Sequence, residues 1–208
     1  EIPDKAIRSS IIDALYELRL TAPHLHFGHI EIIHFILDEA KDYMATLAFL
    51  YYQNSDEADR VLTNKSDNEK IQKLRQQLVA ALEKRLDRKL ERIFHILGFK
   101  YPPDDIENAY AGIKSSDNEL RFNAIDFLDN LLEPDLKKVI IPIAESALFE
   151  EVVSKSMPRF VNKISDGKDY YESLLNSEDT VLKQMALDLI EYLNDPQYIP
   201  LIAKALND

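Results

Sequence analysis

Four of the five histidines lie close together near the start of the chain. They are His24, His26, His29 and His34. Neutral imidazoles bind zinc, copper or nickel, so His24, His26 and His29 are candidate metal ligands. Their spacing is not the i, i+4 pair of a helical zinc site, and no cysteine completes a set. Pro23 and Gly28 predict a loop leading into a helix. We therefore favour a loop filled by aromatic side chains over a metal site.

A second cluster is basic and lies within a long helical pattern. The cations are Lys84, Arg85, Arg88, Lys89 and Arg92, interspersed with Glu83, Asp87 and Glu91. We take Arg85, Arg88 and Arg92 as candidate binding residues for an acidic protein surface, a phosphate-bearing ligand or an anionic membrane leaflet. Alternating charges one turn apart are also typical of a solvated helix face, and that interpretation is the favoured one.

Other reaction chemistry has little support. The absence of cysteine removes thiol catalysis and thiolate zinc sites, and four scattered glycines cannot form a phosphate-binding loop. The acid pairs Asp104-Asp105 and Glu150-Glu151 are placed to stabilise helix starts. Tyrosine pairs at 51–52 and 170–171 are expected to fill a core or an interface. We therefore expect no catalytic residues and no cofactor.

The charge balance bears on partners. The 208 residues carry 25 basic and 37 acidic side chains, a net charge of -12. Such a chain repels phosphate backbones, so no nucleic-acid partner is expected. No stretch approaches the ~20 apolar residues that span a bilayer, so we expect no membrane insertion of this chain.

The spacing of apolar residues determines the expected fold class. They recur every three or four positions over 7–18, 32–50 and 71–97, whereas strand-like alternation is absent. Gly98 and then Pro102-Pro103 are expected to end the long third helix. Prolines 103 and 134, each followed by an acid, indicate two further helix starts. The sequence predicts an all-α fold of about ten helices with no sheet.

Three segments share one pattern: an acid, an apolar residue, a base one turn later, and a small or apolar residue. Its polar and small positions are Asp4 and Arg8, then Asp117, Arg121 and Ala124, then Asp179, Lys183 and Ala186. The acid is expected to cap its helix, the base to pair with that acid or with a neighbouring repeat, and the small residue to admit an adjacent helix. Burial is expected at the six aligned apolar and small positions. These are Leu120, Ala124, Leu128, Leu182, Ala186 and Ile190.

The segment 195–208, with Pro196 and Pro200, resembles the first helix of a HEAT repeat, and the helices around Pro142 and Pro158 resemble it more loosely. The resemblance implies one HEAT-like domain over 1–208, a right-handed α-α superhelix of stacked hairpins. Residues 1–100 would form an irregular part with long helices, and 101–208 the clearer hairpins. A concave face built from the second helices would be the contact surface.

A longer resemblance covers about a fifth of the chain. It lies in 91–106 (ERIFHILGFKYPPDDI), 109–115 (AYAGIKS) and 120–132 (LRFNAIDFLDNLL). These segments resemble the HEAT-containing extension of bacterial ATP/ADP translocase-like membrane proteins, which are of the major-facilitator type. The resemblance implies a non-catalytic interaction or regulatory domain on the cytoplasmic side of an inner-membrane nucleotide transporter. The transport path would lie outside this fragment, and the partner would be a protein or the membrane part of the same chain.

The repeat frame also bears on the ends. The first helix matches the second helix of a repeat, and the last matches a first helix. We therefore expect a piece of a longer chain with apolar surface at one or both ends. Two alternatives stay open. One is a freestanding HEAT-repeat scaffold, and the other is a HEAT-like nucleic-acid base glycosylase, which the acidic charge disfavours.

Overall fold

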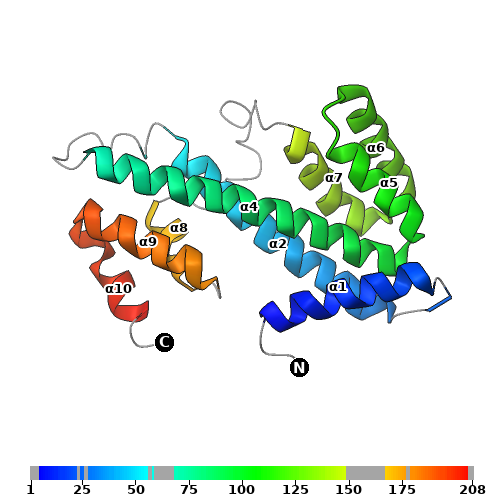
Figure 1. The fold of residues 1–208 in the computed structure, drawn as a ribbon, viewed down its shortest axis with the longest axis horizontal. Helices are drawn as coiled ribbons and strands as arrows, with labels where there is room; N and C mark the ends of the chain where they lie inside the picture. Colours follow the sequence, from blue (N-terminus) through cyan, green and yellow to red (C-terminus); the bar gives the residue numbers. More distant parts are fainter. Residues whose placement is uncertain are drawn as a thin grey trace. The chain divides into compact units, whose positions relative to one another are not determined.

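The computed structural model describes residues 5–22, 24, 25, 28–55, 58, 68–148, 167–176 and 179–205. In this part of the chain the fold is all-α with no strand, as predicted (Figure 1). The helices are α1 (Lys5–Thr21), α2 (His29–Gln53), α4 (Asn68–Lys100), α5 (Pro103–Ile113), α6 (Asn118–Leu131), α7 (Pro134–Leu148), α8 (Gly167–Leu175), α9 (Thr180–Leu193) and α10 (Ile199–Ala205). A 3-10 turn, Pro196–Tyr198, precedes α10.

The chain forms two compact units. Unit 1 comprises Glu1–Met44 and Asp87–Val152, and unit 2 comprises Ala45–Leu86 and Val153–Asp208. The long helices α2 and α4 each contribute one part to each unit. Each unit thus draws on both the 1–100 and the 101–208 parts of the chain.

In unit 1, α5, α6 and α7 pack in chain order (Figure 1). The prolines at 103 and 134 begin α5 and α7, as the sequence predicts. Gly112 of α5 lies directly against α6: a Cβ added there would be 2.7 Å from the Ala124 Cβ. The small residue of the repeat pattern thus admits a neighbouring helix. The regular superhelix over the whole chain stays a prediction.

The expected stop of the third helix at Gly98 is wrong, because α4 continues to Lys100. Gly98 is instead a contact point for α1. A Cβ added at Gly98 would be 2.7 Å from Tyr16 Cε2, and the Tyr16 ring stacks on His95 at a centroid distance of 4.2 Å. The glycine therefore provides room for a ring, and the helix ends before Pro102, whose ring restricts the residue preceding it.

Unit 2 is built around an aromatic cluster. Its rings are Phe49, Tyr52, Tyr170, Tyr171 and Tyr198, all buried. The side-chain Nε2 of Gln53 donates to the Tyr171 hydroxyl at 3.2 Å, and the Arg75 guanidinium donates to the main-chain carbonyl of Gln53. The cluster confirms that Tyr52 and the 170–171 pair fill a core.

The repeat pattern is confirmed at its caps. Asp117 Oδ1 accepts from the Glu119 amide at 2.8 Å, and Asp179 Oδ1 accepts from the Leu182 amide at 3.1 Å. Arg121 does something other than predicted, because its Nε donates to the Ser115 carbonyl in the preceding loop. Asp4 lies outside the described residues, as does the side chain of Arg8.

Five of the six burial predictions are confirmed. Ala124, Leu128, Leu182, Ala186 and Ile190 are at most 7% exposed. Leu120 is 52% exposed, so its predicted burial is wrong. It lies in the first turn of α6, where its backbone oxygen borders the contact with Gly112 while its side chain remains in solvent. Phe122 and Phe127 of the same helix are also exposed.

We expected apolar surface at one or both ends of the chain, and the terminal helices α1 and α10 expose some of their apolar residues but not all. Ile199 of α10 is 63% exposed and Leu18 of α1 is 48% exposed, whereas Leu201 and Ile12 are buried. Pro142 lies inside α7, which runs through it, and Pro158 lies outside the described residues. None of the described helices combines the length and apolarity required to cross a membrane.

Candidate functional site

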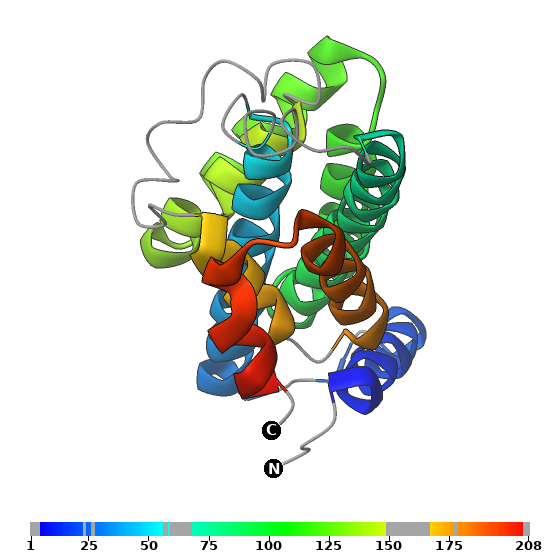
Figure 2. The ribbon, with the colours of Figure 1, turned by 90° about the vertical axis from the view of Figure 1, so that its left-hand side faces the viewer.

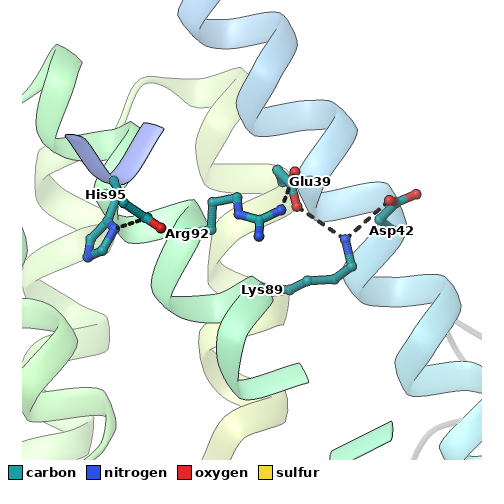
Figure 3. Close-up of polar contacts among 6 residues, drawn as sticks. Glu39, Asp42, Lys89, Arg92 and His95 are labelled. Carbon is teal, nitrogen blue, oxygen red and sulfur yellow. Dashed lines mark hydrogen bonds and ion pairs between the residues drawn. The ribbon is translucent and has the colours of Figure 1, made fainter. Parts of the chain in front are cut away.

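The predicted basic stripe is largely engaged within the fold. In unit 1, Lys89 of α4 lies between Glu39 and Asp42 of α2, with its Nζ 3.2 Å and 3.1 Å from their carboxylate oxygens (Figure 3). Arg92 Nη1 lies 3.2 Å from the other oxygen of Glu39. The Lys89 side chain is only 9% exposed and that of Glu39 only 13%. These cations hold α4 against α2.

Arg85 is similarly drawn inward, in unit 2. Its side chain is 14% exposed and its Nη1 lies 3.9 Å from Asp179 Oδ2, beyond hydrogen-bonding distance. Arg88 is exposed. Of the three candidate binding residues, Arg85 and Arg92 therefore approach acids of their own fold, and the structure does not present the three as one open surface.

His95 of α4 has a polar contact and an aromatic contact within unit 1. Its Nδ1 lies 3.2 Å from Asp13 Oδ1, and its ring stacks on Tyr16 (Figure 3 shows the His95 contact). Burial raises the pKa of Tyr16, with the nearby carboxylates of Glu107, Glu17 and Asp104 adding to the rise. The tyrosine thus stays protonated and serves as a packing surface that joins α1 to α4.

The histidine metal candidates lie largely outside what the structure describes. His24 is exposed, His26 lies outside the described residues, and His29 begins α2 with a side chain that is not described. Within the described ranges, no group of three histidine, cysteine or acidic side chains could hold a metal ion.

A groove in unit 2 is the feature with the geometry of a binding site. It has a volume of about 730 Å³ and lies between the first half of α4 and α9, which run beside each other in Figure 2. Its lining is mainly apolar or small. The lining residues are Leu74, Gln77, Ala80, Ala81 and Lys84 of α4, and Thr180, Val181, Gln184, Met185 and Asp188 of α9.

Two contacts define the register of the groove walls. Arg85 approaches Asp179 at one end, and Lys70 donates to the Tyr192 hydroxyl at the other. Because residue numbers rise along α4 as they fall along α9, the two helices are antiparallel. Lys84 therefore lies at the end where α9 begins, and Asp188 lies toward the opposite end.

The groove exists because the side chains on its two walls differ in size. Ala80 and Ala81 of α4 have short side chains that leave space in the middle of the groove. On the other wall, Val181 of α9 is 60% exposed. The walls stay in place because Leu78 and Leu82 of α4 and Leu182 and Ala186 of α9 are buried. An apolar trough with polar rims can accept the apolar face of another helix.

Sequence reasoning missed this groove. It placed Lys84 in the basic cluster of the long helix and aligned the α9 segment as a repeat, but nothing in it brought these two helices together. The one feature of the sequence that could have indicated a groove is the Ala80-Ala81 pair, which interrupts a helical pattern rich in leucine. Comparisons of the chain with protein-family models, with curated proteins and with solved structures found no match.

Proposed function

We propose that this chain is a non-catalytic interaction domain that binds a helix of a partner protein in the groove between α4 and α9. The groove carries the proposal: it is an open, mainly apolar surface between two helices that each bury a separate apolar face, with Leu78 and Leu82 on α4 and Leu182 and Ala186 on α9. Helix-in-groove recognition uses such surfaces, with apolar anchors entering between helices and polar side chains lining the rim.

The repeat frame supports the same surface. α9 is aligned with α6 as the second helix of a repeat, and second helices form the concave contact face of HEAT-like proteins. The groove uses the outer side chains of α9, notably Val181 and Met185, while Leu182 and Ala186 face inward. One helix therefore serves both the core and the binding surface.

The place of the domain in a translocase-like membrane protein belongs to the same proposal. It rests on the resemblance within 91–132 alone. Its test is the reading frame that flanks this chain, because a transporter requires several apolar spans of ~20 residues. A flanking frame without such spans would leave a freestanding scaffold.

Met185 provides a direct test of the groove. The chain has three methionines, and Met185 lines the groove while Met44 lies in unit 1. The protein is labelled with ¹³C-methyl methionine and its methyl signals are followed by NMR. Addition of 14-residue amphipathic helical peptides with a leucine stripe should shift the Met185 signal and leave the Met44 signal unchanged. Peptides of equal composition with dispersed leucines should have no effect.

Blocking the groove provides the matched control. Ala81→Trp places a large side chain in the trough and should abolish the peptide-induced shift, whereas Ala111→Trp on the exposed side of α5 should preserve it. Circular dichroism checks that both variants fold. If no helical peptide moves Met185 at millimolar concentration, the groove is not a helix-binding site and the proposal is wrong.

A further inference from the structure

Helix α6 leaves three large apolar side chains in solvent. Phe122 is 65% exposed, and Leu120 and Phe127 are also exposed. The helix is nevertheless well packed in unit 1, because it lies against both α5 and α7 and buries Ala124 and Leu128 (Figure 1). The exposed side chains therefore belong to the outer face of an ordered helix, and a face of this kind is a candidate interaction surface.

The three apolar side chains lie in two rows along the helix. Seven residues make nearly two turns, so Leu120 and Phe127 share one row. That row lies beside α5, because the Leu120 backbone oxygen borders the close contact between α5 and α6. Phe122 shares the other row with Asp129, which pairs with Lys137 of α7 at 3.1 Å. The Phe122 row therefore lies toward α7.

Two carboxylates lie between these rows. Glu119 and Asp126 are both exposed and are also seven residues apart, which separates them by about 10 Å along the axis. Neither pairs with a cation in the part of the chain that the structure describes. The other exposed residues between the rows, Asn123 and Asn130, carry no charge. The outer face of α6 thus combines apolar side chains with negative charge that has no local counter-charge.

The cations closest in the chain are engaged elsewhere. Arg121, the only base of α6, donates to a carbonyl of the preceding loop. Lys114 pairs with Asp87 of α4 at 2.6 Å, and Lys137 and Lys138 of α7 pair with acids next to them in the fold. Residues 102–135 contain nine acids and two bases. The negative charge of α6 is therefore a property of the whole α5–α6 hairpin.

From this arrangement we infer that the outer face of α6 binds a basic amphipathic helix of a partner protein. Arginines two turns apart on that helix meet Glu119 and Asp126, and its apolar side chains pack on Leu120 and Phe127. An arginine that reaches the second row also stacks on the Phe122 ring. The surface lies in unit 1, so it is a second interaction surface, independent of the groove in unit 2.

Charge selects this occupant over the others. A second copy of the chain has a net charge of -12 and is repelled, as are anionic lipids and nucleic acids. An apolar helix without cations would remove the two carboxylates from water and leave them unpaired, which costs affinity. A basic amphipathic helix supplies both the apolar contacts and the counter-charges.

Two peptides test the inference. Each has the length of α6, 14 residues, and carries a row of leucines. Beside that row, one peptide has two arginines seven residues apart and the other has two glutamates. Both are titrated calorimetrically into the full chain carrying Ala81→Trp, which blocks the groove of unit 2. The arginine peptide should bind, more weakly as salt rises, and the glutamate peptide should not. Failure of the arginine peptide to bind overturns the inference and leaves the groove proposal, tested through Met185, untouched.

Neutralisation of the two carboxylates locates the charge contribution. Glu119→Gln with Asp126→Asn should weaken binding of the arginine peptide about fivefold, as expected for two exposed ion pairs. The matched control is Glu31→Gln with Asp38→Asn, which removes two exposed acids of the same spacing from α2 and should preserve the affinity. Equal weakening by the two double variants would show attraction by overall charge alone, and the inference would be wrong.

Removal of the rings locates the apolar contribution. Phe122→Ser with Phe127→Ser should weaken binding about tenfold, whereas Phe35→Ser, at an exposed position of α2, should not. Circular dichroism checks that each variant folds, which the exposure of these side chains favours. Binding that is undiminished in the Phe122 and Phe127 double variant places the peptide elsewhere and overturns the inference.

Discussion

Lys89 illustrates how a single charged residue is kept inside a helical core. Its ammonium group contacts two carboxylates of α2, one of which it shares with Arg92 (Figure 3). Removing a charge from water is costly, and here the cost is offset by short contacts to opposite charges. Loss of one member would leave the Glu39 carboxylate partly buried with weaker compensation, so the lysine is expected to matter for stability more than a surface lysine does.

Replacement of Lys89 tests this difference. Lys89→Ala should lower the free energy of unfolding by about 2–4 kcal/mol, because it removes the ammonium group from the largely buried Glu39. Among the described residues, Glu39 then keeps only its ion pair with Arg92, and the partly exposed Asp42 also loses the ammonium group. The control is Lys138→Ala, whose pair with Asp135 is 73% and 88% exposed and should contribute less than about 1 kcal/mol. Urea denaturation measures both. Equal effects of the two substitutions would show that the α2–α4 cluster behaves as a surface pair.

Tyr171 gives a pH-dependent prediction. Complete burial raises the pKa of its hydroxyl well above the usual value, a rise that the Gln53 hydrogen bond only partly offsets. A tyrosine whose pKa is raised in the folded state stabilises the fold below the unfolded-state pKa of about 10, and that contribution is lost as pH rises further. Stability should therefore fall above pH 10.

Absorbance at 295 nm detects this ionisation. The Tyr171 hydroxyl should ionise only as the chain unfolds, and Tyr171→Phe should weaken the alkaline loss of stability. Tyr110, whose pKa is raised to about 12 by burial and the acids Glu91 and Asp87, contributes a second increment in the same direction. An alkaline unfolding profile unchanged by Tyr171→Phe would contradict the assignment.

At the scale of elements, the closest described approach between α5 and α6 depends on two small residues. Gly112 faces Ala124, and the backbone oxygen of Leu120 would lie 3.3 Å from an added Cβ. Because backbone as well as side chain borders this contact, a larger residue must push the helices apart. The helix pair is therefore specified by small side chains as much as by apolar ones.

Substitution of Gly112 tests whether the α5–α6 contact requires a small residue. Gly112→Val should destabilise the fold by about 1–3 kcal/mol through overpacking, despite improving the intrinsic backbone preference. Ala111→Val, at the exposed neighbouring position, should change stability by a few tenths of a kcal/mol. Thermal unfolding followed by circular dichroism distinguishes them. Partial recovery is expected in Gly112→Ala combined with Ala124→Gly, and its absence would place the strain elsewhere.

At the scale of the molecule, acidity limits the available partners. A net charge of -12 repels nucleic acid. In addition, Arg85 and Lys89 of the basic cluster lie close to carboxylates of Asp179, Glu39 and Asp42. The two compact units each include part of α2 and part of α4, so neither unit is a single continuous stretch of chain.

Weak nucleic-acid binding is therefore expected. The chain should not shift a duplex of 25 base pairs at 50 mM salt and 10 μM protein, because few cations are placed to neutralise phosphates. Electrophoretic mobility shift measures this, with a basic DNA-binding protein as the positive control. A salt-sensitive shift at this concentration would reopen the base-glycosylase alternative.

The helical class and the starts of α5, α6, α7 and α9 were predictable from the sequence, because they depend on local information. Apolar spacing, the caps Asp117 and Asp179, and the prolines at 103 and 134 all act within one or two turns. The repeat frame likewise predicted the burial of Leu128 and Ala186. The same frame was wrong at Leu120, because only its backbone oxygen borders the contact with Gly112 and its side chain stays exposed.

The tertiary structure alone decided what the charged and small residues do. Gly98 looked like a helix stop but receives the Tyr16 ring, since only the folded chain brings α1 onto α4. Arg92 looked like part of a binding stripe but pairs with Glu39, 53 positions earlier in the chain. The groove between α4 and α9 could not be predicted from the sequence, because its walls come from segments about a hundred residues apart and the Ala80-Ala81 pair marks only one of them. Local interactions select helices, and only packing selects which of their faces remain open.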